Sequence, residues 1–424
     1  MERIPDKCAD DLSLPRQEAL DGILSRCRFA PETEWLPTEE AFGRVLAEDM
    51  VSKNTLPNHL TANRDGVAVY FHRFASGMPD TASWQEGVDY VFSNTGIGIP
   101  GDFDTEILIE QVRFDEEGRI RFTQAPACKG ENTLSVGSEL KEGERLARKG
   151  QTLTPSLMAL LAKGGHTCFP VVRKPVVAFL PTGSELVPAG EFLPLRKNVD
   201  ANSVLVRGKL LEWGAEPLIY PICKDDPDAL RAALTGALSK ADIVLLNAGS
   251  SKGTDDFSHQ VLHEVGEMLN QQVDTGPGKH TSYTMAGRVP IVGLSGPTTC
   301  CDYTCEWYVK PLIDQYLGRP ATIFPIRTAK LLTGLTMTKK GVLFMMGARV
   351  MVDSGGEWVV APAGAIQDGR AIEQKVNCFI PMGAGFDKKA GDEVEIELRW
   401  PFAAPRHEPE WIAQVKTTQL SISR

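Results

Sequence analysis

Small residues, hydroxyls and two carboxylates follow an apolar run in the middle of the chain. The run Ile243–Leu246 leads into the segment AGSSKGTDDF at 248–257, which precedes a helix-like stretch. A buried strand, a small-residue loop and a helix bring backbone amides to the carboxyl end of a sheet, where they meet an anion. The glycines allow close approach, and the other side chains offer hydroxyls, a cation and metal-binding oxygens: Gly249, Ser250, Ser251, Lys252, Gly253, Asp255 and Asp256. A plain strand-to-helix turn with an Asp N-cap explains the segment equally well.

Three other loops combine glycine or Asp with polar side chains next to an expected helix or strand. In PTGSEL (181–186), Glu185 is placed to hold a metal or a ribose, whereas helix capping by Thr182 or Ser184 is the alternative. Asn202 follows Asp200 and suits a base or pterin edge, although an N-cap role is slightly favoured. The segment GLSGPTT (293–299) runs from a strand into a helix, so its glycines and hydroxyls suit a phosphate.

A lysine and three cysteines carry weaker indications. Lys279 lies in the stiff turn GPGKH (276–280), which suits an oxyanion, but a lone loop lysine is usually solvated. Cys300, Cys301 and Cys305 stand on one expected helix, where buried apolar thiols are favoured over a soft-metal site. The sequence contains no HExxH or P-loop motif, which argues against zinc protease and NTPase chemistry.

These loops need a framework, and the middle of the chain alternates strands with helices. The expected strands are Val176–Leu180, Pro217–Ile222, Ile243–Leu246 and Val289–Leu294. The expected helices are Asn202–Trp213, Asp226–Ser239, Phe257–Met268 and Thr298–Tyr316. This alternation predicts a largely parallel sheet covered on both faces.

The two flanks of the chain differ from its middle. Helices are expected over Leu14–Phe29, Thr38–Met50 and, between the cap Thr154 and two glycines, up to Lys163. Short strands between turns, such as Gly66–Tyr70, Glu106–Ile109 and Arg119–Phe122, indicate a small β domain. After about residue 325 an all-β module is expected from Leu331–Met337, Gly341–Val352, Glu357–Ala361, Cys378–Ile380 and Glu393–Leu398.

Composition narrows the class of protein. A length of 424 residues favours two to four domains, and a net charge of −10 argues against a nucleic-acid-binding protein. No apolar run is long enough for a membrane span, and no signal peptide is recognised at the N-terminus. Nine scattered cysteines indicate reduced thiols, so a cytoplasmic location is expected.

In this order and spacing, the motifs resemble those of the MoeA family of molybdopterin molybdenumtransferases, which includes the E domain of gephyrin. The resemblance covers roughly residues 10 to 400. It is carried by LPNHLTANRDGVAVY, TGIGIP with the later Glu110, TGSEL, AGSSKGTDDF, PGKH and GLSGPT, and near the end by VNCFIPMGAG and AGDEVEIEL.

The resemblance implies an elongated homodimer with a multidomain α/β fold. Residues 1–51 and 136–172 would form a helical part, 52–135 an inserted β-rich domain, and 173–325 a MoaB/MogA-like three-layer α/β domain that binds molybdopterin. Residues 326–403 would form a C-terminal β-barrel-like domain, with 404–424 as a tail. The site is expected between the α/β domain of one subunit and the β-rich domain of the other.

The resemblance also implies an activity, insertion of molybdate or tungstate into adenylated molybdopterin with Mg²⁺-dependent release of AMP. The catalytic residues would then be Asp256, Glu185, Asp65 and Lys279, with Mg²⁺ at Glu185 and Asp256 and the oxyanion at Lys279. Asp65, Thr95 and the further candidate Glu139 would reach in from the partner subunit. The pterin nucleotide would contact Thr182, Gly183, Asp200, Asn202, Gly249, Ser250, Ser251, Gly253, Ser295, Gly296 and Thr95. A MogA-like adenylyltransferase or a molybdoenzyme is a further expected partner.

Several residues depart from the family pattern. Arg64 replaces a Met before Asp-Gly, LSVGSE (134–139) lacks three arginines, His280 replaces a Pro, and Pro297 replaces an Asn. The departures cluster in the expected pocket and leave the framework intact. They motivate a second hypothesis, a molybdopterin-binding carrier or sensor that has lost catalysis, and a weaker third one, a scaffold protein.

Overall fold

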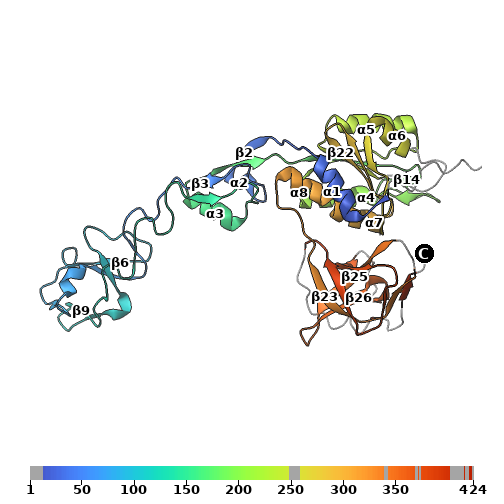
Figure 1. The fold of residues 1–424 in the computed structure, drawn as a ribbon. Coiled ribbons are helices and arrows are strands. Elements are labelled where there is room, and N and C mark those ends of the chain that lie inside the picture. Colours follow the sequence, from blue (N-terminus) through green and yellow to red (C-terminus); the bar gives the residue numbers. More distant parts are fainter. Residues whose placement is uncertain are drawn as a thin grey trace, which may run out of the picture. The chain divides into compact units, whose positions relative to one another are not determined.

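The computed structural model describes residues 13–247, 258–338, 342–367, 371, 374–401, 415 and the backbone of 420–422. The chain divides into two compact units, Thr33–Val172 and Met1–Glu32 with Arg173–Arg424. Figure 1 shows the elements of both units. Among the described residues, no helix combines the length and the apolar character needed to cross a membrane.

A six-stranded sheet forms the centre of the larger unit. Its order is β16 (Glu216–Ile219), β13 (Val176–Pro181), β17 (Ile243–Asn247), β22 (Val289–Gly293), β21 (Ser282–Ala286) and β18 (Glu267–Asn270). The first four strands are parallel, and β21 and β18 add an antiparallel edge. The predicted parallel sheet is therefore confirmed, with two strands that the sequence analysis did not identify.

Helices cover both faces of this sheet, as Figure 1 shows. Leucines of α5 (Pro227–Leu238) and α6 (Ser258–Val265) pack on one face against alternate strand residues such as Leu180 and Leu246. On the other side lie α1 (Arg16–Arg26), α4 (Asn202–Glu212), α7 (Thr298–Thr304) and α8 (Lys310–Leu317), with the π-helical segment η4 (Cys305–Val309) between α7 and α8. Since β13 and β17 are buried from both sides, they consist of continuous apolar runs.

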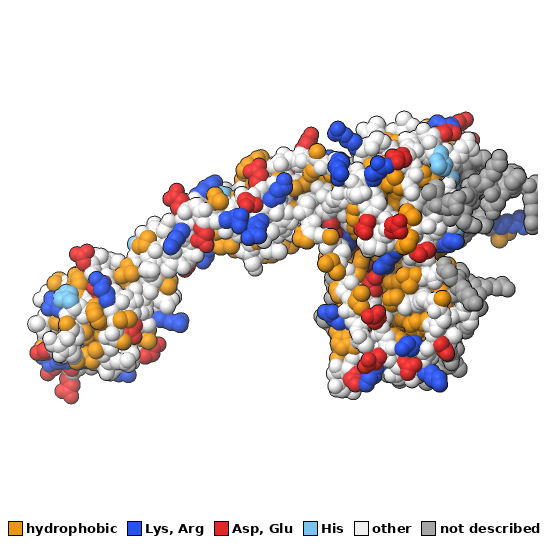
Figure 2. Space-filling model, in the orientation of Figure 1, with side chains coloured by type: hydrophobic (Ala, Val, Ile, Leu, Met, Phe, Trp, Pro, Cys, Tyr) orange, Lys and Arg blue, Asp and Glu red, His pale blue; other side chains and the backbone are white. Residues whose placement is uncertain are grey.

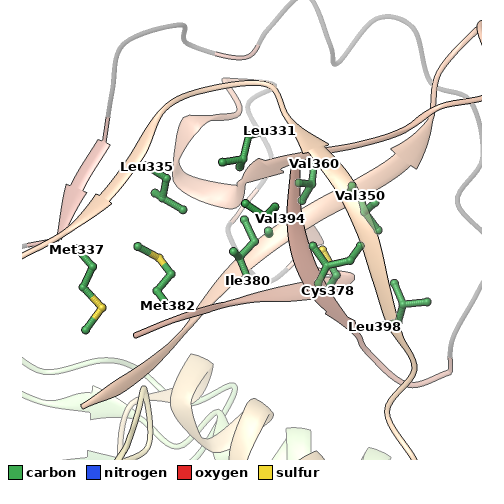
Figure 3. Close-up of a cluster of buried hydrophobic side chains, with 13 residues drawn as sticks. Leu331, Leu335, Met337, Val350, Val360, Cys378, Ile380, Met382, Val394 and Leu398 are labelled. Carbon is green, nitrogen blue, oxygen red and sulfur yellow. The ribbon is translucent and has the colours of Figure 1, made fainter. Parts of the chain in front are cut away.

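A closed β-barrel follows the sheet domain. Strand β25 (Leu343–Val352) pairs with both β26 (Trp358–Pro362) and β27 (Cys378–Met382), and β23 (Ile326–Leu331) and β29 (Glu393–Leu398) complete the ring. Figure 3 shows the apolar side chains that fill it, among them Val360, Ile380 and Val394. Closure removes the free sheet edges that would otherwise be open to pairing with another chain. The predicted C-terminal β-barrel-like domain is confirmed.

The unit Thr33–Val172 contains three small cores, the third of which consists of Ala62, Ala68, Ile99 and Phe103. In the first, β2 (Thr33–Pro37) pairs with β12 (Cys168–Val172), β3 (Met50–Val51) pairs with β11 (Arg145–Ala147), and α3 (Pro155–Lys163) packs beside them. In the second, β5 (Gly66–Val69) pairs with β6 (Tyr90–Ser93) and β7 (Thr105–Leu108). The remaining pairs are β4 (Thr61–Ala62) with β10 (Thr133–Leu134) and β8 (Val112–Phe114) with β9 (Ile120–Phe122).

Some predicted helices are wrong in extent. The helix expected over Thr38–Met50 ends at Ala41, because the backbone of the following residues pairs across to Gln151 and Pro170 instead. The helix expected over Phe257–Met268 ends at Val265, after which the chain enters β18. At that turn, a Cβ on Gly266 would lie 2.5 Å from the main-chain oxygen of Met285, so only glycine lets β18 approach β21.

The first helix lies in a different unit from the one expected. Helix α1 was assigned to a helical part together with residues 136–172, whereas the structure groups it with the α/β unit. Its buried Ala19 and Ile23 supply the apolar stripe of a helix that contacts β18 and β21.

Candidate functional site

Parallel strands β13, β17 and β22 bring their carboxyl ends to one edge of the sheet. The Thr182 hydroxyl, just after β13, donates a hydrogen bond of 2.7 Å to the main-chain oxygen of Asn247, the last residue of β17. Ser295 and Gly296 follow β22 on its other side. Ligands of open α/β sheets bind at this kind of edge.

A buried amide pair forms the centre of this edge. The Asn202 side-chain nitrogen donates to Asn247 Oδ1 and to the Gly296 main-chain oxygen, both at 2.7 Å. Asn247 Nδ2 donates in turn to the main-chain oxygen of Ser295 at 3.0 Å. Thr182, Asn202, Ser295 and Gly296, which the sequence analysis proposed separately, are thus linked through Asn247.

Two polar atoms in this network lack a partner among the described residues. Asn202 and Ser295 are each 6% exposed, yet Asn202 Oδ1 and Ser295 Oγ accept and donate no hydrogen bond within the part of the chain that is described. A buried polar group without a partner costs about 1–3 kcal/mol. Such a cost is typical of a site that a polar ligand completes.

The N-cap role favoured for Asn202 from the sequence is wrong. Helix α4 begins at Asn202 itself, and it is Asp200 that accepts the amide of Ser203 at 3.0 Å as well as its hydroxyl. Because Asp200 accepts the hydrogen bonds of the first turn, the Asn202 side chain does not cap the helix and contacts the sheet edge instead. Asp226 caps α5, and the predicted capping role of Thr154 on α3 is confirmed.

The loop after β13 presents a free carboxylate. The Ser184 amide donates to Asp225 at 2.8 Å, and Lys197 Nζ donates to the Ser184 main-chain oxygen at 2.7 Å, so the loop is held from both sides. Gly183 has φ +142°, and a Cβ there would lie 2.6 Å from Glu185 Oε2. The Glu185 side chain is exposed, and its carboxylate makes no hydrogen bond or ion pair with other described residues.

Lys279 lies on a turn that contacts helix α7. Gly278 has φ +101°, and a Cβ there would lie 2.4 Å from the Thr304 methyl group, so the turn lies flat on the helix. The Gly278 amide also hydrogen-bonds to Cys300, whose thiol pKa is nevertheless raised because it is largely buried. The Lys279 side chain is exposed.

The remaining cysteines form no metal site in the described part of the chain. Cys301 and Cys305 are buried and share a hydrogen bond, which raises the pKa of the Cys301 thiol. Among described residues, no group of three or more His, Cys, Asp or Glu could hold a metal ion, and the eight described cysteines are free thiols. The predicted burial of these thiols is confirmed for Cys301 and Cys305, whereas Cys300 is partly exposed.

Asp65 and Thr95 pair in the unit Thr33–Val172. The Thr95 amide and hydroxyl both donate to Asp65 Oδ1, at 2.8 and 2.9 Å. These bonds, the amide first, hold the pKa of the exposed Asp65 carboxyl below its usual range. Glu139, the other candidate from this unit, pairs with Lys163 at 3.2 Å.

Five predicted site residues lie outside the described residues: Gly249, Ser250, Ser251, Gly253 and Asp256. Asn247, which organises the buried network, was not predicted as a site residue. A signal was present, since it is the polar residue that ends the apolar strand IVLLN. Its role depends on the pairing of β17 between β13 and β22, which a single sequence does not reveal.

Charge is mixed on the surface. Figure 2 shows acidic and basic side chains interspersed on the visible face, and the net charge is −10. This surface differs from the continuous basic face of a nucleic-acid-binding protein.

Two family models match the chain. The model of the MoeA N-terminal region (domain I and II) matches residues 14–165, and the model of a probable molybdopterin binding domain matches residues 178–315. The second match contains Glu185, Asn202 and Ser295, and the first contains Asp65 and Thr95.

Curated relatives and solved structures agree with these models. Molybdopterin molybdenumtransferase of Bacillus subtilis is 30% identical over 325 residues, which is 72% of this chain and 75% of that protein. The enzyme of that name from Staphylococcus aureus is 27% identical over 91% of this chain and 95% of its own length. Two crystal structures of the MoeA protein of Pyrococcus horikoshii, each covering 91% of this chain, have TM-scores of 0.75 and 0.72 at 25% and 24% identity, and cover 99% and 100% of those chains. The chain therefore belongs to the MoeA family of molybdopterin molybdenumtransferases.

Proposed function

We propose that this protein inserts molybdate into adenylated molybdopterin and releases AMP, as a step of molybdenum cofactor biosynthesis. The observation that carries the proposal is the sheet edge where Asn202 Oδ1 and Ser295 Oγ are buried without a partner among described residues. A pterin has ring N–H groups and a carbonyl at its edge, and a phosphate has acceptor oxygens. A pterin N–H would donate to Asn202 Oδ1, and a phosphate oxygen or the pterin carbonyl would accept from the Ser295 hydroxyl, which an apolar ligand could not do.

The charged residues around this edge suit the rest of the substrate. Mg²⁺ usually binds one or two carboxylates together with substrate phosphates and water, so the free Glu185 carboxylate, with Asp256, fits as its protein ligand. When bound, Mg²⁺ would neutralise charge on the phosphoanhydride. Lys279 is proposed to attract molybdate or tungstate, since its ammonium is solvent-exposed beside α7.

Asp65 and Thr95 are proposed to act from a second copy in a homodimer. Segment 192–211 of the α/β unit exposes apolar side chains: Phe192 at 87%, Leu195 at 91%, Val204 at 62% and Leu211 at 59%. Val204 and Leu211 lie two turns apart on the same face of α4. Exposed apolar groups of this size mark interaction surfaces, and a second copy is the proposed occupant.

The wider assignment follows the same reasoning. We infer the four-part division at residues 51, 135, 172 and 325, with residues 1–32 joined to the α/β part, supported by the separate cores of the sheet, the barrel and the two parts of Thr33–Val172. The cytoplasm is the proposed location, because the eight described cysteines are free thiols. A MogA-like adenylyltransferase or a molybdoenzyme remains the proposed protein partner.

The test is turnover by the purified protein with adenylated molybdopterin, Mg²⁺ and molybdate. We expect AMP release that falls at least tenfold in Asn202→Ala and stays unchanged in Lys240→Ala, an exposed position after α5. Binding of adenylated molybdopterin without AMP release would support the carrier or sensor hypothesis instead. Absence of both binding and release would contradict the proposal.

A further inference from the structure

A buried acid lies beneath the turn that carries Asp65. Glu106 is in the middle of β7, where it pairs with Ala68 of β5, and it is 0% exposed. Its Oε1 accepts the Ser93 hydroxyl at 2.6 Å, and its Oε2 lies 3.4 Å from the Arg64 amide. A carboxyl group in the centre of a small sheet is uncommon, since burial strongly disfavours its charged form.

Two carboxylates hold the same two segments together. Glu106 contacts Arg64 and Ser93, while Asp65 Oδ1 receives the amide and hydroxyl of Thr95. Arg64 and Asp65 are adjacent in the chain, and Ser93 and Thr95 are two residues apart. The turn at 63–66 and the segment 93–95 are therefore joined twice, once inside the sheet and once at the surface.

The turn has little freedom to move away from β7. A Cβ on Gly66 would lie 2.3 Å from the Ile107 main-chain oxygen and 2.9 Å from Glu106 Cγ. The Ile109 amide donates to the Asp65 main-chain oxygen at 3.0 Å, and Asn132 Nδ2 donates to the Glu106 main-chain oxygen at 3.1 Å. Glu106 is thus the only buried side chain among these contacts that binds both segments.

The carboxyl group is costly at this position. Burial raises the pKa of Glu106, the bonds from Ser93 and from the Arg64 and Asn63 amides lower it in part, and the nearby charge of Asp65 raises it further. An apolar side chain would pack in β7 without this cost. The fold alone therefore does not explain the acid.

We propose that Glu106 is a positioning residue that fixes the Arg64–Asp65 turn against Thr95, so that Asp65 keeps one oxygen bound and offers the other to the substrate. This inference rests on the role proposed above for Asp65. Glu106 itself has no contact with solvent, so it acts only through the turn.

Three variants separate positioning from stability. In Glu106→Gln, the amide oxygen accepts from Arg64 and the amide nitrogen donates to the Ser93 hydroxyl, so turnover should stay within about threefold of the wild type. In Glu106→Leu, the Arg64 amide and the Ser93 hydroxyl lose their acceptor, so both the thermal midpoint and turnover should fall. In the double variant Ser93→Ala with Glu106→Leu, the orphaned hydroxyl is removed as well and only the Arg64 amide lacks its acceptor, so the midpoint should recover in part while kcat stays roughly tenfold low.

A second measurement does not depend on turnover. The pKa of Asp65, followed through its carboxyl ¹³C resonance, should stay below the usual range in the wild type and in Glu106→Gln. It should move toward the usual value for an aspartate in the double variant, because Thr95 is no longer held in place. This readout decides the inference even if the wild type releases no AMP.

The inference is overturned if turnover of the double variant recovers together with its thermal midpoint, since Glu106 would then be purely structural. It is also overturned if the Asp65 titration of the double variant matches that of the wild type. If Asp65 shifts as expected while no variant, including the wild type, shows turnover, the positioning role stands and the proposed reaction fails.

Discussion

The sheet edge of the α/β unit and the Asp65 turn of the other unit present polar groups in opposite ways. At the edge, Asn202 and Ser295 are neutral, buried and short of partners among described residues. At the turn, Asp65 is charged and exposed, and two bonds from Thr95 hold one of its oxygens. The first arrangement selects a ligand by hydrogen bonds in a dry environment, whereas the second supplies a charge with a fixed direction.

A cluster of buried charged side chains in the α/β unit is fully paired, unlike the polar atoms at its sheet edge. Lys209 of α4 and Arg399 after β29 both bind Asp302 and Glu306 on α7 and η4, at 2.7 to 3.0 Å for the bonds of ordinary length. All four side chains are nearly buried, and each is paired. The contrast is one of charge: these buried ions are paired, whereas other neutral polar atoms of this interior, such as Asn270 Oδ1 and the Tyr283 hydroxyl, also lack a partner among the described residues.

Replacing Arg399 should give the largest effect. Arg399→Leu leaves two buried carboxylates with Lys209 alone, so unfolding free energy should fall by about 3–5 kcal/mol. Urea unfolding measures it, with Lys330→Leu as the control, because the exposed Lys330–Glu357 pair should contribute at most about 1 kcal/mol. Equal losses of unfolding free energy in the two variants would show that the buried network contributes no more to stability than an exposed ion pair.

Removing the hydroxyl at the sheet edge should affect binding and stability in opposite directions. Ser295→Ala deletes a buried group without a partner among described residues, so the free protein should be equally stable or more stable. Affinity for adenylated molybdopterin should fall by about 0.5–1.5 kcal/mol, the net contribution of one hydrogen bond. Calorimetric titration and thermal unfolding check both. Unchanged affinity would remove Ser295 from the ligand site.

Replacing Lys279 should weaken saturation by molybdate more than binding of the pterin. Lys279→Ala should raise the molybdate concentration for half-maximal turnover by roughly fivefold, because an exposed charge contributes about 1 kcal/mol at contact. The effect should fade at high salt. Steady-state kinetics at two salt concentrations measures it, with the exposed Lys240→Ala as the control. A larger loss of pterin binding than of molybdate saturation would contradict the assigned role.

The smallest effect should appear at the Asp65 turn under acid. The folded pKa of Asp65 is lowered, so its contribution to stability is present above the unfolded value of about 4 and is lost as the pH falls through the folded pKa. Thr95→Val removes the hydroxyl bond and retains the amide, so the folded pKa should lie closer to the unfolded value and the loss of stability should be smaller and complete at a higher pH. Urea unfolding between pH 3 and pH 5 compares the wild type with Thr95→Val. The same pH dependence of the unfolding free energy in both proteins would show that the Thr95 hydroxyl does not stabilise the Asp65 carboxylate.

The parts of the fold that follow from periodicity and capping were predictable from the sequence. The four parallel strands, the cap Thr154 and four of the five barrel strands were recovered, because apolar runs and capping residues act locally. The strand expected over Leu331–Met337 was wrong, since β23 ends at Leu331 and β24 (Leu335–Met337) lies outside the barrel. The helix expected after Thr38 was wrong in extent, because the backbone of that segment hydrogen-bonds to Gln151 and Pro170, which are distant in the chain. Strands β21 and β18 were missed for the same reason, since antiparallel edges depend on partners far along the chain.

The candidate site was predictable in its loops but not in its contacts. Thr182, Asn202 and Ser295 were identified, yet Asn247, which joins them, reads in the sequence as the end of an apolar strand. Glu106 was expected in a strand but was given no role, because the contacts of its side chain depend on the register of β7 against β5. Asn202 was taken as a cap because Asp200, two residues earlier, competes for that position only in three dimensions.

The most direct measurement follows the side-chain amides of Asn202 and Asn247 in protein labelled with ¹⁵N-asparagine while adenylated molybdopterin is added. The account predicts saturable shifts of both resonances, with the midpoint that calorimetry gives for binding, while Asn58 on the unit Thr33–Val172 stays unchanged in protein kept too dilute to associate. Saturated binding by calorimetry with both resonances of Asn202 and Asn247 unmoved would contradict the claim that the sheet edge holds the ligand.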